Sequence, residues 1–90
     1  MNNDIKTLVD GLNAYEQRNY KQAVEIWTVL AEQGDAEAQF NLGVLFKNGI
    51  GVTQNDTEAM RWLRKSAEQG YEHAMLIVEV IDRESEDNTG

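Results

Sequence analysis

Apolar residues recur along most of this chain at the three- and four-residue spacing of an amphipathic helix. Ile26, Trp27 and Leu30 mark one such face, and Trp62 and Leu63 mark another. Alternating, strand-like patterns are not evident. The pattern predicts an all-α chain of five helices, over Asp4–Glu16, Tyr20–Gln33, Asp35–Lys47, Asp56–Gln69 and Tyr71–Arg83.

The chain also repeats itself with an offset of 36 residues. The tetrapeptide AEQG occurs at 31–34 and again at 67–70. Across Tyr20–Ala38 the same offset gives 6 identities in 19 positions, including Ala23 with Ala59. Because this period is close to the length of one helix–turn–helix unit, it predicts antiparallel helices in about two and a half helical hairpins.

Glycines mark both the ends and the contacts of these helices. Gly34 and Gly70 follow second helices, where a left-handed residue commonly ends a helix. Gly43 lies inside a predicted helix, which costs roughly 1 kcal/mol relative to alanine. Its missing Cβ would let a neighbouring helix come close, and Gly11 occupies a comparable place. Asn55 or Asp56 can cap the fourth helix, and Asn55 with Glu58 resembles a capping box.

The segment DAEAQFNLGVLFKNGIGVTQNDTEAMRWLRKSAEQG resembles a Sel-one-like repeat, a longer-looped relative of the tetratricopeptide repeat. The matching positions are Ala36, Ala38, Gln39, Phe40, Leu42, Gly43, Gly49, Gly51, Val52, Glu58, Ala59, Trp62, Ala67, Glu68 and Gly70. The resemblance implies a short right-handed α–α superhelix. We expect a single repeat domain over residues 1–84 and a disordered acidic tail over residues 85–90.

The two ends of the chain depart from this pattern. The first hairpin has a shorter spacing from Gly11 to Ala23 and looks more like a tetratricopeptide unit. In the last half-repeat, Glu79 stands where the family has glycine. Close packing of a further hairpin is therefore not expected, and we interpret the last helix as a cap.

The net charge of the chain limits the classes of molecule that it can bind. Sixteen acidic and eight basic residues give a net charge of −8, which opposes binding to nucleic acid or to an anionic membrane surface and would attract a basic partner. No apolar run approaches the ~18 residues of a membrane span, and the first residues lack the features of a signal peptide. We therefore expect a cytoplasmic protein. The acidic end that starts at Glu68 is either a solvated cap or a docking surface.

Residues for catalysis or metal binding are sparse. The chain has no cysteine, one histidine (His73) and two serines (Ser66 and Ser85), with no histidine near either serine in sequence. Carboxylates are scattered at expected surface positions, without a metal-ligand spacing. Trp27 and Trp62 fall on the predicted buried faces of second helices. We expect neither enzymatic activity nor a cofactor.

The family resemblance implies a concave surface lined by the first helix of each hairpin. Positions counted from Gly11 and Gly43 give the candidate partner-binding residues Leu8, Leu12, Tyr15, Phe40, Val44, Lys47, Asn48, Leu76, Val80 and Arg83. The apolar members would form a stripe across this surface. A short superhelix could instead close on itself and bury part of the stripe, with Phe40 serving in packing.

Two functions fit these observations. The first is a non-catalytic adaptor or scaffold that binds a protein or peptide through the concave face. The second is a small acidic inhibitor or immunity protein that neutralises a basic toxin or nuclease. Neither end of the chain is a fully polar cap, which leaves a homodimer through the terminal helices open.

Overall fold

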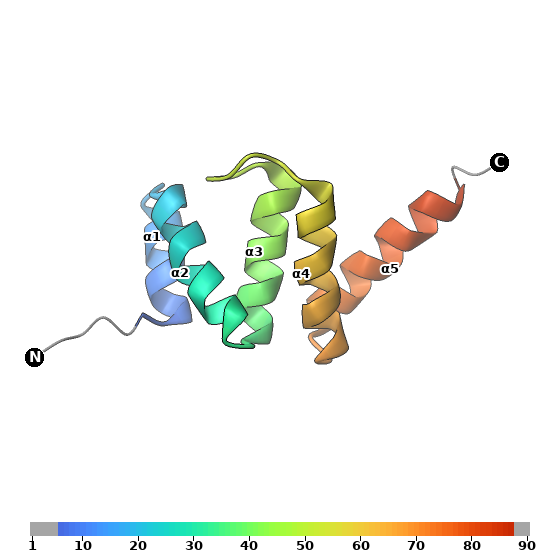
Figure 1. Ribbon diagram of the computed structural model, residues 1–90, viewed down its shortest axis with the longest axis horizontal. Coiled ribbons are helices and arrows are strands. Elements are labelled where there is room, and N and C mark those ends of the chain that lie inside the picture. The colour runs from blue at the N-terminus through green and yellow to red at the C-terminus, as the bar shows by residue number, and fades with distance from the viewer. Residues whose placement is uncertain (1–5, 88–90) are drawn as a thin grey trace, which may run out of the picture.

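A computed structural model describes residues 6–87, which form five α-helices and no strand. The helices stand in a row, each antiparallel to the one before it, with α1 and α5 at opposite ends (Figure 1). This arrangement confirms the predicted all-α solenoid of helical hairpins. The helices are α1 (Leu8–Glu16), α2 (Tyr20–Glu32), α3 (Ala36–Asn48), α4 (Asp56–Glu68) and α5 (Glu72–Asp87).

Helix α1 begins at a reciprocal capping box. The Thr7 hydroxyl accepts a hydrogen bond from the Asp10 amide at 3.3 Å, and the Asp10 carboxylate accepts one from the Thr7 amide at 2.7 Å. These bonds satisfy amides that lack partners within the helix. The first helix therefore starts four residues later than the predicted Asp4, a residue that lies outside the described part of the chain.

Side chains also cap the starts of α3 and α4. Asp35 accepts from the Ala38 amide at 2.8 Å, and Asn55 accepts from the Glu58 amide at 3.0 Å. The predicted capping box at Asn55 is only half formed, because the Glu58 carboxylate accepts from Arg61 at 3.0 Å instead. At the other ends, Gly34 and Gly70 have φ angles of 99° and 86°, which confirms their predicted left-handed conformation.

The long loop between α3 and α4 lies along the top edge of the row in Figure 1 and extends toward α2. It carries Gly49 and Gly51, both at positive φ. A Cβ built on Gly51 would lie 2.8 Å from the carbonyl oxygen of Tyr20, at the start of α2. The loop of the second hairpin thus packs directly against the first hairpin.

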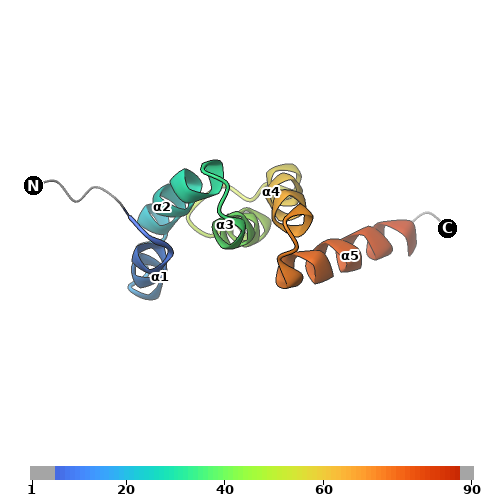
Figure 2. The same ribbon diagram turned by 90° about the horizontal axis from the view of Figure 1, so that it is seen from below.

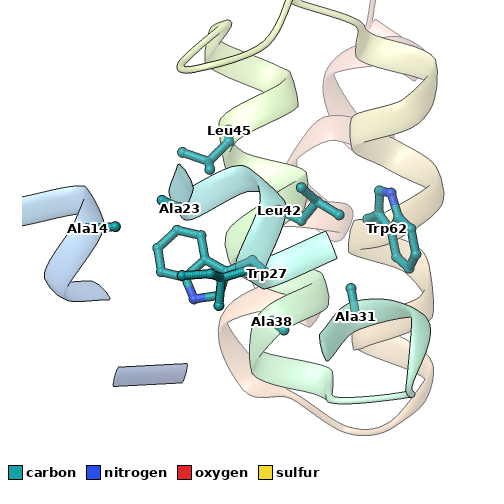
Figure 3. Close-up of a cluster of buried hydrophobic side chains, with 9 residues drawn as sticks. Ala14, Ala23, Trp27, Ala31, Ala38, Leu42, Leu45 and Trp62 are labelled. Atoms are coloured by element: carbon teal, nitrogen blue, oxygen red, sulfur yellow. The ribbon is translucent and has the colours of Figure 1, made fainter. Parts of the chain in front are cut away.

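A continuous core runs between the helices, as Figure 3 shows. Both tryptophans belong to it, Trp27 from α2 and Trp62 from α4, as the sequence predicts. The other buried members are small or aliphatic: Ala14, Ala23, Ile26, Ala31, Ala38, Leu42 and Leu45. Gly11 faces the Trp27 indole so closely that a Cβ there would lie 2.6 Å from Trp27 Cδ1.

Helix α5 slants away from the row and packs mainly on α4 (Figures 1 and 2). It continues to Asp87, into the acidic segment 85–90 that the sequence predicts to be disordered; residues 88–90 lie outside the described residues. The sequence contains neither glycine nor proline between Gly70 and Gly90. Arg83 also donates a hydrogen bond to Glu79, one turn earlier, at 2.6 Å, which supports the helix.

Arg64 of α4 forms an ion pair with Asp82 of α5. Its guanidinium donates two hydrogen bonds to the Asp82 carboxylate, at 2.7 and 3.2 Å. The hydrogen bonds and charge of Asp82 raise the pKa of Arg64 above its ordinary value. Glu68, four residues after Arg64 on the same helix, adds a smaller electrostatic contribution to this shift. The bonds to Asp82 join α4 to α5 through two residues that are 18 apart in sequence.

Candidate partner-binding groove

Helices α1 and α3 enclose a groove with a volume of about 440 Å³. Half of the predicted partner-binding residues line it. Leu8, Leu12 and Tyr15 come from α1, and Phe40 and Val44 come from α3. Because first helices of successive hairpins stand on the same side of the solenoid, positions counted from Gly11 and from Gly43 meet in one place.

The floor of the groove is buried and apolar. Trp27 and Leu45 form it, and only 3% and 2% of their surfaces are exposed. The Trp27 indole donates a hydrogen bond to the carbonyl oxygen of Leu8 at 3.4 Å, which links the floor to the start of α1. The Tyr15 ring lies 6.1 Å from the Trp27 ring and 5.2 Å from the Tyr20 ring. These contacts hold Tyr15 at the edge of the groove.

The rim of the groove is partly exposed to solvent. Val9 and Leu12 on α1 are 60% and 45% exposed, whereas Leu8, Phe40 and Val44 are half-buried. Packing between the helices thus buries part of the apolar stripe and leaves part of it open. Val9 also lines the groove, although helical spacing from Gly11 does not predict it.

An aromatic cluster joins the Phe40 side of the groove to the start of α5. The Phe40 ring lies 5.2 Å from the Tyr71 ring and 5.9 Å from the His73 ring. Phe40 therefore lines the groove and also packs between α3 and the start of α5. The packing role considered from the sequence is thus present in the structure, and partner binding by Phe40 stays a prediction.

Negative charge lies beside this cluster. Burial raises the pKa of Tyr71, and the carboxylates of Glu37 and Asp35 raise it further. Glu37 also lines the groove, together with the side chain of Asn41. The groove thus combines apolar walls with one acidic and one amide group, an arrangement that can orient a bound segment.

The other five predicted residues lie elsewhere. Lys47, Leu76 and Val80 surround a separate hollow of about 260 Å³, together with Ile77 and Ile81. Asn48 is exposed at the end of α3, outside the residues that line either hollow. Arg83 lies on another side of α5, beside Met75. The structure therefore divides the predicted stripe into two separate surfaces.

The groups with potential catalytic chemistry have structural partners. Ser66 is fully buried, and its hydroxyl donates to the carbonyl oxygen of Ala36 at 2.7 Å. His73 is exposed and stacks beside Phe40 and Tyr71. Within residues 6–87, no group of three or more histidine and carboxylate side chains is placed to hold a metal ion. None of the helices in that range is both long and apolar enough to span a membrane.

The family model of the Sel1 repeat matches residues 9–35 and 36–71 of this chain. The chain belongs to the Sel1 repeat family. The first hairpin, whose spacing looks more like a tetratricopeptide unit, is thus a Sel1 repeat as well. The crystal structure of a Sel1 repeat protein from Oxalobacter formigenes has the same fold, with a TM-score of 0.69 and 25% identity over 88% of this chain and 47% of that one.

Curated relatives share the repeat within longer chains. An F-box protein of Arabidopsis thaliana is 37% identical over 75 residues, which cover 82% of this chain and 21% of the relative. The DAP3-binding cell death enhancer 1 of Rattus norvegicus is 37% identical over 54 residues, which cover 60% of this chain and 11% of the relative. The chain therefore spans about a fifth or less of these relatives. Sel1 repeats are in general protein–protein interaction modules.

Proposed function

We propose that this Sel1 repeat chain is a non-catalytic adaptor that binds a protein or peptide partner in the groove between α1 and α3. The observation that carries this proposal is the open apolar rim of the groove, where Val9 and Leu12 are exposed above the buried Trp27. Exposed apolar surface of this kind marks contact sites in other proteins.

The groove suits a segment of polypeptide. Its volume of about 440 Å³ accommodates a few apolar side chains, and the polar groups of Glu37 and Asn41 offer hydrogen bonds at its edge. A partner segment that places apolar residues over Trp27 and a donor group near Glu37 would satisfy both features.

Leu12→Glu tests this proposal, because Leu12 is exposed and its replacement leaves the core unchanged. Val29→Glu is the matched control, since Val29 is 53% exposed on α2 and lies outside the groove. The immobilised full chain captures proteins from a lysate of its own organism, and binding of the captured partner is then measured with both variants. We expect Leu12→Glu to abolish binding and Val29→Glu to retain it. Equal binding by the two variants would refute the groove as the site.

Phe40 is less suitable for this test. Its ring packs against Tyr71, so Phe40→Ala would change both the groove and the contact between α3 and α5. A loss of binding in that variant would not distinguish contact with a partner from a change of structure.

A second candidate function, neutralisation of a basic toxin or nuclease, is favoured by the charge. The chain carries a net charge of −8, and Glu37 and Asp35 lie beside the groove. Salt distinguishes the two functions, because screening weakens charge-driven association far more than apolar contact. Capture of a basic enzyme that is released at high salt supports the inhibitor, whereas a partner retained at high salt supports the adaptor.

The proposal also covers the lack of catalysis, the cellular location and the oligomeric state. Ser66 and His73 have structural roles, which supports a function without catalysis. The cytoplasmic location stays a prediction. A homodimer is tested by sedimentation velocity of the purified chain at low and high salt, since its equal negative charges would repel each other most at low salt.

A further inference from the structure

A second hollow lies between α4 and α5, at the C-terminal end of the row, with a volume of about 630 Å³. Its base is apolar and is formed by Ala67, Met75 and Val78. Met75 is 48% exposed, so this base is open to solvent. Charged side chains surround it: Arg64, Glu68, Glu79, Asp82 and Arg83.

The 36-residue repeat allows the residues of this hollow to be compared with the equivalent residues inside the solenoid. Counted back by 36, Ala67 and Val78 correspond to Ala31 and Leu42. Those two residues share a buried cluster with Trp62 of α4 (Figure 3). The equivalent position one repeat earlier is therefore covered by a helix that inserts a tryptophan. Within the described residues, no helix follows α5 to cover Ala67 and Val78.

We propose that this terminal hollow, defined by Ala67, Met75 and Val78, binds a helix of a partner protein in which an aromatic residue is followed directly by a basic residue. The aromatic side chain takes the place that Trp62 takes one repeat earlier. Burial of an aromatic ring over exposed Met75 and half-buried Val78 supplies the apolar contact.

Glu79 is the reason to expect a basic residue after the aromatic residue of the partner helix. One repeat earlier the same position is Gly43, and Leu63, the residue after Trp62, packs directly on it. At Glu79 a carboxylate replaces that bare backbone, so a leucine there would press against a charged group. A lysine or arginine would instead share the Glu79 carboxylate, which pairs with Arg83 at 2.6 Å at an exposed site and has further acceptor positions.

The charges around the hollow select the same partner. Three acidic and two basic side chains line it, and both basic ones already bond to acids, Arg64 to Asp82 and Arg83 to Glu79. The charges within each of these two ion pairs offset each other, so Glu68 leaves the rim of the hollow with a net negative charge. A second copy of this chain carries a net charge of −8 and would be repelled, whereas a basic helix would be attracted.

Met75 distinguishes this hollow from its equivalent inside the solenoid. The corresponding Gln39 donates a hydrogen bond to the carbonyl oxygen of Ala31 at 3.1 Å and accepts one from Gln69 at 3.0 Å. A methionine side chain cannot form these two hydrogen bonds. The terminal hollow thus offers apolar contact and charge in place of the polar bonds that hold α4 to its neighbours.

A synthetic peptide tests the proposal. It contains Gln54–Gly70 of this chain with Leu63→Lys, so that its own cap at Asn55 is kept and Trp62 is followed by a basic residue. The labelled peptide is titrated with the full chain and followed by fluorescence anisotropy. We expect saturable binding, and we expect peptides with Trp62→Ala or Leu63→Glu to bind about thirtyfold more weakly, as for hot-spot residues.

Variants of the full chain make the test specific. Glu79→Lys should reverse the preference, so that the Leu63→Glu peptide binds more tightly than the Leu63→Lys peptide. Two controls should leave the affinity unchanged. Leu76→Ser changes an exposed residue of α5 outside the hollow, and Leu12→Glu changes the groove between α1 and α3.

Three results would overturn the proposal. The first is the absence of saturable binding by the Leu63→Lys peptide. The second is equal binding of both peptides by the Glu79→Lys chain. The third is a dimer of the chain alone that Met75→Lys dissociates, since a second copy would then be the occupant of the hollow.

Discussion

Gly43 of α3 and Leu63 of α4 lie so close that a Cβ on Gly43 would come within 2.7 Å of Leu63 Cγ. The carbonyl oxygen of Ala59 would lie 3.1 Å away. The bare backbone of one helix is thus the surface on which the next helix packs. This contact explains why a helix interior contains a glycine, and it sets the separation between α3 and α4.

Gly43→Ala is expected to destabilise the protein, although alanine is the better helix former. The gain in helix propensity is roughly 1 kcal/mol, while overpacking against a branched carbon and a backbone carbonyl costs about 1–3 kcal/mol. We predict a net loss of about 1 kcal/mol in the free energy of unfolding, measured by urea denaturation. Adding Leu63→Ala should make the Gly43→Ala change less costly, because it removes the Cγ contact. A more stable Gly43→Ala single variant would contradict the close approach.

Gly51→Ala should cost more stability than Gly34→Ala. Both glycines have positive φ, at 76° and 99°, so alanine is strained at either site by about 1–2 kcal/mol. A Cβ on Gly34 would meet no atom within 4 Å, whereas a Cβ on Gly51 would lie 2.8 Å from the Tyr20 carbonyl oxygen. The difference between the two variants in chemical denaturation measures the contact of the long loop with α2, and equal losses would show that this contact is absent.

Gln39→Leu tests the buried amide between the hairpins. Gln39 is 5% exposed, donates to the Ala31 carbonyl and accepts from Gln69. Leucine fills a similar volume but removes both hydrogen bonds. Because the Ala31 carbonyl still accepts from the Gly34 amide at 3.0 Å, the loss is about 0.5–1.5 kcal/mol for each bond. Gln69→Ala is the control at the exposed end of the same chain of bonds. We expect thermal unfolding to show the larger loss for Gln39→Leu, and the reverse order would contradict the bonding pattern.

The repeat and the helices could be predicted because their signals are local. Spacing of Trp27 and Trp62 identified the buried faces, and the offset of 36 residues identified the hairpins. The left-handed residues Gly34 and Gly70 follow from the same local rules, because each ends a single helix. The meeting of Leu12 with Val44 in one groove follows from the repeat, which places first helices side by side.

The division of the binding surface could not be predicted in this way. Periodicity tells which face of a helix is apolar, but it does not give the angle at which α5 leaves the row. That angle separates Leu76 and Val80 from Phe40, and it brings Asp82 to Arg64, 18 residues away. The sequence does not predict the Thr7 capping box, because Asp10 stands at the third helical position where the usual pattern has glutamate or glutamine.

Glu37→Gln is expected to lower the pKa of Tyr71 toward its ordinary value of about 10. Burial raises this pKa most, and the negative charges of Glu37 and Asp35 add to it, so removing one charge leaves a smaller shift. The titration of Tyr71 is obtained as the difference in phenolate absorbance between the parent chain and Tyr71→Phe, in the presence and absence of Glu37→Gln. Glu25→Gln is the control, because Glu25 on α2 is exposed and outside the groups that shift Tyr71.

The same shift makes stability depend on alkaline pH. Because the pKa of Tyr71 is higher in the folded chain than in the unfolded chain, the unfolded state loses its proton first. The contribution of neutral Tyr71 is complete below the unfolded pKa of about 10 and is lost as pH rises through the folded pKa. Tyr71→Phe should therefore flatten the fall in unfolding free energy above that pH. If Glu37→Gln left both the titration and this fall unchanged, the charge beside the groove would have no influence on Tyr71, and burial alone would account for the shift.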